Sequence, residues 1–115
     1  MENSDLEKSK VFVILEIIEY VSNSVVIKTI IRKNTGNVSA IAFDSGEALS
    51  ARVSPFETFI QVIDGRAEIV INEISHNLKT GESIIVPSHC YTTIKAKVRF
   101  KMLSTVIKSG YEEVI

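Results

Sequence analysis

The segment spanning residues 46–93 carries four polar side chains that could bind a ligand: Arg52, Ser54, Thr58 and Thr92. A guanidinium is permanently protonated and only donates hydrogen bonds, so Arg52 could bind a carboxylate or phosphate through two parallel bonds. The three hydroxyl groups could surround the same ligand or bind only water. A divalent metal prefers imidazole or carboxylate ligands, which these four residues lack. The set therefore favours binding of a small anion without a metal.

Two other interpretations of Arg52 stay open. Its side chain could lean out of the fold into water, or it could pair internally with Glu57 or Asp64, because a buried and unpaired charge is costly. Glu57 is a fifth candidate for the pocket. It immediately precedes Thr58, so in a regular strand it would face the opposite way unless a bulge near Pro55 turns it inward.

The remaining residues that could do chemistry are His76, His89 and Cys90. We expect His76 to face solvent in a short strand between two turns. His89 and Cys90 are adjacent, and adjacent side chains in an extended chain diverge, so we do not expect an activated thiol. An unusual metal site built from His89, Cys90 and Glu57 is an alternative, as is acid/base catalysis by Glu57 or His89.

The elements that position these residues are predicted to be strands. From residue 25 onwards β-branched residues alternate with polar ones, and turn residues interrupt the alternation at short intervals. Asn34–Asn37 and Asn72-Glu73 are predicted turns, and Asp64-Gly65 is the strongest hairpin signal. Roughly nine or ten short strands without a long helix predict an all-β sandwich or closed barrel.

The N-terminal residues 1–23 are predicted to form an arm. Residues 11–20 are strongly apolar, and we interpret them as a short strand leading into a helical turn. So much apolar surface on a free arm would be unfavourable in water, so we expect a second copy of the chain to cover it. Residues 24–108 form the predicted barrel and residues 109–115 a tail.

The glycine and proline spacing of this barrel resembles the small single-domain bacterial cupins. Gly46, five residues, Arg52, Ser54, Thr58 and six further residues to Gly65 resemble the first cupin motif; Gly81, five residues, Pro87 and then Thr92 resemble the second. The resemblance implies a cupin-like antiparallel jelly-roll β-barrel and a homodimer. It also implies that Arg52, Ser54, Thr58 and Thr92 stand where cupins carry metal ligands, so we expect neither metal nor cofactor here.

Composition excludes several classes of protein. Thirteen basic and 14 acidic residues give a net charge of −1, without the basic excess that nucleic-acid binding requires. A single cysteine excludes an internal disulfide and a four-thiolate zinc site. Residues 1–20 resemble neither a signal peptide nor a membrane span, because the apolar stretch is short and contains two glutamates. We therefore expect a cytoplasmic protein with no nucleic-acid or membrane partner.

Three functions follow as hypotheses. The first is a metal-free module that binds a small, possibly anionic, molecule in the barrel mouth without catalysis. The second, from the resemblance, is a cupin-type enzyme such as a metal-dependent oxygenase or isomerase. The third is a structural or interaction module whose pocket has degenerated. The residues identify neither the ligand nor a substrate.

Overall fold

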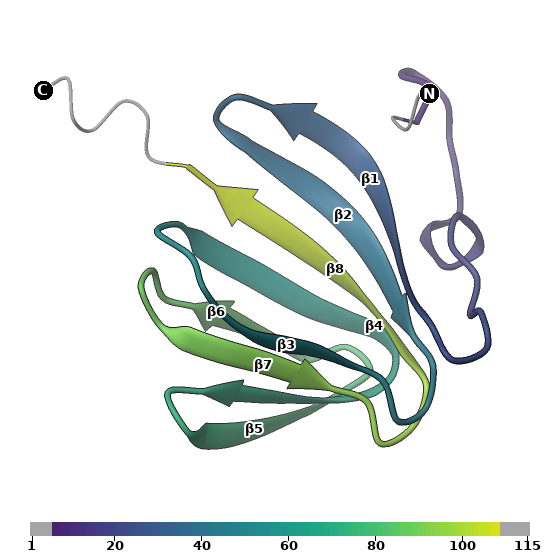
Figure 1. Cartoon of the computed structure of the whole chain (residues 1–115). Coiled ribbons are helices and arrows are strands. Elements are labelled where there is room, and N and C mark those ends of the chain that lie inside the picture. Colours follow the sequence, from purple (N-terminus) through teal and green to yellow (C-terminus); the bar gives the residue numbers. More distant parts are fainter. Residues whose placement is uncertain (1–5, 109–115) are drawn as a thin grey trace, which may run out of the picture.

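A computed structural model of the 115-residue chain describes residues 6–108. It contains one short 3-10 helix, η1 (Ile14–Glu16), and eight strands (Figure 1). The strands are β1 (Val25–Lys33), β2 (Gly36–Phe43), β3 (Ala48–Val53), β4 (Glu57–Ile71), β5 (Ile74–Lys79), β6 (Ser83–Val86), β7 (Tyr91–Lys95) and β8 (Phe100–Ile107). No helix within the described residues is long and apolar enough to cross a membrane.

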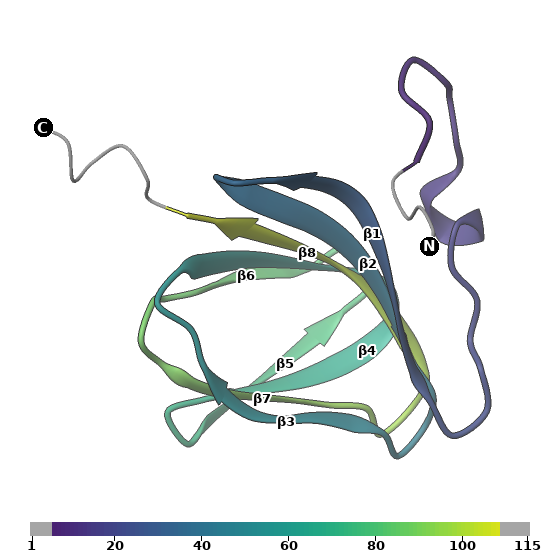
Figure 2. The same ribbon diagram turned by 45° about the horizontal axis from the view of Figure 1, so that its top comes forward.

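All strand pairs are antiparallel, and together they form one sheet in the order β1-β2-β8-β4-β7-β3, with β5 and β6 also paired to β4. The sheet curls on itself so that β3 and β7 face β8 and β6 across an interior (Figure 2). The predicted all-β barrel class is therefore confirmed. Alternation of apolar residues supports this closure, because each strand turns one face to the interior.

The predicted hairpin at Asp64-Gly65 is wrong. β4 runs through this dipeptide as one 15-residue strand: its first half pairs with β6 and β8, and its second half with β5 and β7. A register shift between Val62 and Asp64 marks a bulge, followed by Gly65 at φ +87°. The residues that would suit a tight turn instead bend one strand around the corner of the barrel.

The predicted turn at Asn72-Glu73 is confirmed. Both residues have positive φ, at +47° and +72°, and Ile71 pairs directly with Ile74. This is the two-residue hairpin that positive φ at both central positions produces. Asn34 and Thr35 likewise connect β1 to β2, since Lys33 pairs with Gly36.

The N-terminal arm contains the predicted helical turn but no strand within residues 6–23. It packs on the outer face of the sheet, away from the interior (Figure 2). Ile18 is buried there against Ile30, Ala40 and Ala42. The small side chains of the two alanines leave room for the arm, and this contact explains part of the apolar content of residues 11–20.

Two polar contacts fix residues 15–20 of the arm to the sheet. The Lys101 ammonium, only 9% exposed, donates to the carbonyl oxygen of Leu15 at 2.8 Å. The Tyr20 hydroxyl donates to Asp64 at 2.6 Å. Burial is the largest cause that raises the pKa of Tyr20 well above its usual range, and this hydrogen bond is the second. Within residues 6–23, five large apolar side chains of the arm remain exposed: Val11, Phe12, Val13, Leu15 and Val21.

The main hydrophobic core fills the interior at the end of the barrel opposite the ligand candidates. Phe43 and Phe100 are fully buried, and their rings stack with centroids 4.4 Å apart and an interplanar angle of 13°. Ile69, Val62 and Met102 surround them. This packing closes one end of the barrel and leaves the other end open.

Candidate functional site

A cavity of about 180 Å³ opens at the end of the barrel where β3, β6 and β8 finish and β4 and β7 begin. We call it the barrel cavity. Its fifteen lining residues are Ile41, Leu49, Arg52, Ser54, Phe56, Thr58, Ile60, Val86, Pro87, Cys90, Thr92, Ile94, Met102, Ser104 and Val106. All four side chains first considered as ligand binders are among them, so the structure brings Arg52, Ser54, Thr58 and Thr92 together.

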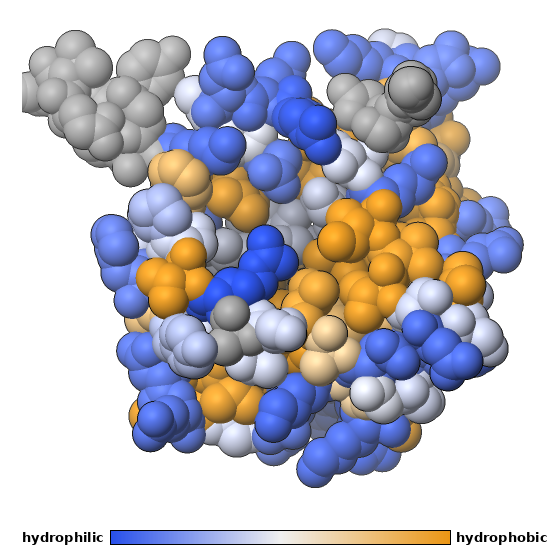
Figure 3. Space-filling view, viewed as in Figure 1, coloured by the Kyte–Doolittle hydropathy of each residue, from blue (hydrophilic) through white to orange (hydrophobic). Residues whose placement is uncertain are grey.

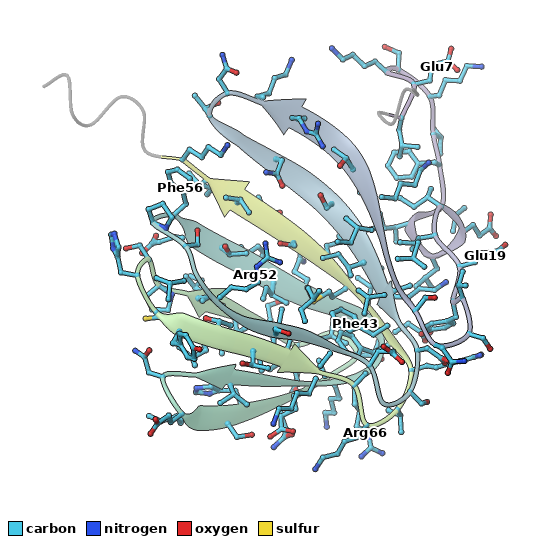
Figure 4. The ribbon with its side chains drawn as sticks, in the orientation of Figure 1. Glu7, Glu19, Phe43, Arg52, Phe56 and Arg66 are labelled. Atoms are coloured by element: carbon cyan, nitrogen blue, oxygen red, sulfur yellow. The ribbon has the colours of Figure 1, made fainter. Side chains whose placement is uncertain are left out.

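Arg52 reaches the cavity because β3 carries a bulge. Leu49 pairs with Ile94 of β7 while Arg52 pairs with Thr92, so three residues of β3 advance against two of β7. In a regular strand, residues three apart face opposite sides. The extra residue restores both Leu49 and Arg52 to the cavity side. Figure 4 shows the labelled Arg52 side chain extending from β3 over the interior of the curled sheet.

Among residues 6–108, Arg52 is the only charged side chain that lines the barrel cavity. Within residues 6–108 no carboxylate forms an ion pair with it: Asp64 instead accepts the Tyr20 hydroxyl, and Glu57 does not line the cavity. The interpretation that Arg52 pairs internally with either acid therefore has no support in this part of the chain. Its guanidinium is exposed at the cavity mouth.

The three hydroxyl residues lie at the mouth with partly buried side chains. Ser54 Oγ accepts the backbone N–H of Phe56 at 3.1 Å, which holds the loop between β3 and β4. Thr92 Oγ1 donates to the carbonyl oxygen of Cys90 at 3.3 Å. Thr58 lies opposite Val86 in the β4–β6 pair and opposite Val106 in the β4–β8 pair. Each hydroxyl oxygen keeps lone pairs for a further partner.

Glu57 does not line the cavity, as expected of a residue one position from Thr58 without an intervening bulge. The bulge that the sequence allowed at Pro55 lies earlier, in β3. His89 is exposed in the loop after Pro87, at φ +63°, and its N–H donates to the carbonyl oxygen of Ser54 at 2.6 Å. It supports the mouth through its backbone.

Cys90 lines the cavity and is half-buried, and Asn72 Nδ2 donates to its sulfur at 3.4 Å. Within residues 6–108 no three or more His, Cys, Asp or Glu side chains converge so as to hold a metal ion. The alternative His89–Cys90–Glu57 site is therefore not assembled in the described residues. His76, expected at the surface, is half-buried in β5.

The sequence reasoning did not identify the apolar floor of the cavity. Five buried side chains form it, contributed by β2, β4, β6, β7 and β8: Ile41, Ile60, Val86, Ile94 and Met102. Strand alternation places each of these residues inward, but only the closed topology brings them beneath Arg52.

Ile27 of β1 lies opposite Ile41 and is 55% exposed, and Figure 3 shows a hydrophobic area over β1 and β2 on this face.

A larger depression of about 680 Å³, the outer groove, is lined by residues of β4 and β5 and of the connections that follow β5 and β7. Its charges are mixed: Arg66, Lys79 and Lys97 lie beside Glu68 and Glu82. Ser75 donates to Glu68 at 2.6 Å, and this hydrogen bond, together with Lys97 and Lys95, lowers the pKa of Glu68. Its three bases exceed its two acids by one, but the two carboxylates would repel an anion, so the outer groove offers a weaker anion site than the barrel cavity.

Comparison with known proteins shows the fold. No protein-family model matches the sequence, and no curated protein matches it. Among solved structures, a conserved protein of unknown function from Streptococcus pyogenes superposes with a TM-score of 0.86 at 22% identity, over 92% of each chain. A cupin superfamily protein from Desulfitobacterium hafniense gives 0.82 at 22% identity, covering 93% of this chain and 97% of that one.

A cupin 2 conserved barrel domain protein from Leptotrichia buccalis is similar over 82% of this chain and 46% of its own, with a TM-score of 0.79 and 25% identity. These likenesses agree with the strand order and with the glycine and proline spacing noted in the sequence. The chain therefore has the fold of the small cupins, an antiparallel sheet curled into an open barrel.

Proposed function

We propose that the protein binds a small anionic molecule in the barrel cavity without a metal, and that Arg52 is its anchor. The observation that carries this proposal is the single positive charge of Arg52 among the cavity-lining residues, with no ion-pair partner within residues 6–108. A carboxylate or phosphate would accept two hydrogen bonds from the guanidinium and neutralise it. The hydroxyls of Ser54 and Thr58 supply further donors around the same position, whereas Thr92 Oγ1 already donates to the carbonyl oxygen of Cys90.

The metal-free part of the proposal rests on the chemistry of the available donors. Neutral hydroxyls are poor ligands for divalent ions, and the one thiol of the lining is a single donor, whereas a zinc site takes three or four protein ligands. A guanidinium cannot coordinate a cation. Metal analysis of the purified protein tests this directly. Stoichiometric iron, nickel, manganese or zinc would instead favour a cupin-type metalloenzyme.

The anchor is tested by thermal unfolding of the wild type and Arg52→Ala in a panel of carboxylates and phosphates. A ligand at 100 times its Kd stabilises by about 2.7 kcal/mol, which in a chain of this size raises Tm by about 10 °C or more. Arg52→Ala should lose this shift. Arg66→Ala, which removes a guanidinium from the outer groove, should keep it. No selective stabilisation of the wild type by any compound contradicts the proposal.

We also propose that the protein is a homodimer. Val11 is fully exposed and Phe12, Val13 and Leu15 are 41–54% exposed, although the arm already packs on its own sheet. Exposed apolar side chains gathered on one segment are typical of an interface. Sedimentation should give a dimer that Phe12→Glu weakens, with Lys95→Glu, at an exposed position of β7, as control. A wild-type monomer at micromolar concentration would refute this proposal.

A further inference from the structure

We propose that the ligand of the barrel cavity is a monocarboxylate with a short hydrocarbon body, such as a fatty acid of about six carbons. This inference rests on the proposed binding of an anion at Arg52 and adds the chemical class of the rest of the molecule. Three features of the cavity carry it: the separation of its polar and apolar residues, its volume and its charge.

Polar and apolar side chains occupy different depths of the cavity. The polar lining residues are all exposed or half-buried: Arg52, Ser54, Thr58, Cys90, Thr92 and Ser104. The buried lining residues are all apolar, with exposed fractions from 1% for Met102 to 9% for Ile94. A ligand that enters with its anionic group at the mouth must therefore place its remaining atoms against hydrocarbon.

This arrangement selects against polar bodies. A sugar phosphate could pair its phosphate with Arg52, but most of its hydroxyls would lie against apolar side chains such as Ile94 and Met102. The Ser104 hydroxyl, opposite Ile60, could serve only one or two of them. A polar group that loses water without gaining a partner weakens binding strongly. A hydrocarbon body gains affinity at the same place, because its apolar surface leaves water.

The volume limits the size of the ligand. A cavity of about 180 Å³ is slightly larger than the engineered cavity of about 150 Å³ that holds benzene. It is smaller than the roughly 300–1,000 Å³ of sites for drug-sized ligands and cofactors. A body of about six carbons fits, with the carboxylate at the mouth beside Arg52, whereas a nucleotide is too large.

The charge matches one carboxylate. In the part of the chain that the structure describes, Arg52 is the only charged group lining the cavity. The Lys108 ammonium lies 5.5 Å from the centroid of the Phe56 ring, which forms part of the lining. It adds positive potential near the mouth without lining the cavity, so a second anionic group inside would meet no cation.

Isothermal titration with straight-chain carboxylates from acetate to decanoate tests this class. Burial of each methylene should increase affinity about fourfold, and the increase should level off at about six carbons, when the cavity is full. Hexanol and hexanamide serve as neutral controls and should bind at least tenfold more weakly than hexanoate. Inorganic phosphate and glucose 6-phosphate test anions without a hydrocarbon body.

Arg52→Ala separates the two ends of the ligand. In this variant hexanoate and hexanol should bind equally weakly, while the dependence of alkanol binding on chain length remains. Arg66→Ala should behave as the wild type. If phosphate or glucose 6-phosphate binds in an Arg52-dependent way and affinity for carboxylates does not increase with chain length, the carboxylate class is wrong and the anion site stands. If no anion binds, both the class and the proposed function are wrong.

Discussion

The corner of β4 provides a sharp test of the fold. Gly65 has φ +87°, and a Cβ atom added there would overlap the carbonyl oxygen of Arg99 and lie 3.0 Å from the Cα of Phe100. Gly46 has nearly the same φ, +84°, but an added Cβ would meet no atom within 4 Å. The two glycines therefore match in backbone conformation and differ in space. Comparison of Gly65→Ala with Gly46→Ala isolates the close approach of the β7–β8 connection to β4.

Positive φ costs a residue with a Cβ about 1–2 kcal/mol, and this cost applies to both variants. Overpacking a tight site adds about 1–3 kcal/mol, and here the neighbouring atoms are backbone, which cannot rotate away. We therefore expect Gly65→Ala to lower the free energy of unfolding by about 3 kcal/mol or more. Gly46→Ala should lower it by about 1–2 kcal/mol.

Urea denaturation followed by circular dichroism measures both values. Equal destabilisation by Gly65→Ala and Gly46→Ala would refute the continuous path of β4 through Gly65, because it would mean that Gly65 has free space around it, as in an open hairpin turn. A loss so large that Gly65→Ala does not fold agrees with the reasoning provided that Gly46→Ala folds.

Three further predictions follow from other contacts. Hydrogen bonds from the backbone N–H of Asn23, the larger cause, and from the Arg99 side chain lower the pKa of Asp44 from 3.8 to about 2. The contribution of the Asp44 carboxylate to stability should therefore be complete above about pH 4 and be lost as the pH falls towards 2. Asp44→Asn should flatten that part of a plot of urea midpoint against pH. An unchanged slope would contradict the role given to Asp44. Lys101→Met removes the hydrogen bond to Leu15, worth about 1.5–3 kcal/mol for a charged donor; it should increase hydrogen exchange in residues 14–20 while Lys95→Met does not, and equal exchange in both variants would count against the tether. Deletion of Ser50 removes the extra residue of the β3 bulge and leaves Arg52 two positions from Leu49, so both side chains should still face the cavity in a regular strand; anion binding should be retained, and a loss as large as that of Arg52→Ala would contradict this account of the bulge.

The strands were predictable because their side chains alternate locally, but the path of the sheet was not. Asn72-Glu73 forms the predicted two-residue turn, whereas Asp64-Gly65, the stronger signal in sequence, lies within a continuous strand. Local propensity requires only positive φ at Gly65, and both a turn and a bulge satisfy this requirement. The choice between them depends on β8 and β7, which pair with the two halves of β4 from distant parts of the chain.

The site was predicted unevenly for the same reason. Spacing relative to glycine and proline identified the four polar residues that line the cavity, including Arg52. Simple alternation would turn Arg52 away from Leu49, and only the pairing with β7 reveals the bulge that brings both to one side. The floor could not be predicted, because Ile41, Ile60 and Met102 are ordinary inward residues of three strands until the sheet closes.

The polar mouth and the packed core occupy different ends of the barrel, and this separation explains how one fold can hold different chemistry. Arg52, Ser54, Thr58 and Thr92 lie outside the main buried cluster that contains Phe43 and Phe100. Exposed substitutions away from packed groups usually change stability by about 0.5 kcal/mol or less, whereas removal of a buried aromatic ring costs about 3–5 kcal/mol.

Arg52→Ala should therefore leave the urea midpoint almost unchanged while it abolishes ligand binding. Phe100→Ala should lose most of the stability, because it leaves Phe43 without its stacked partner. A strong destabilisation by Arg52→Ala would mean that the guanidinium holds the fold together rather than serving the cavity. In that case the charge at the mouth would be structural, and anion binding would need another cause.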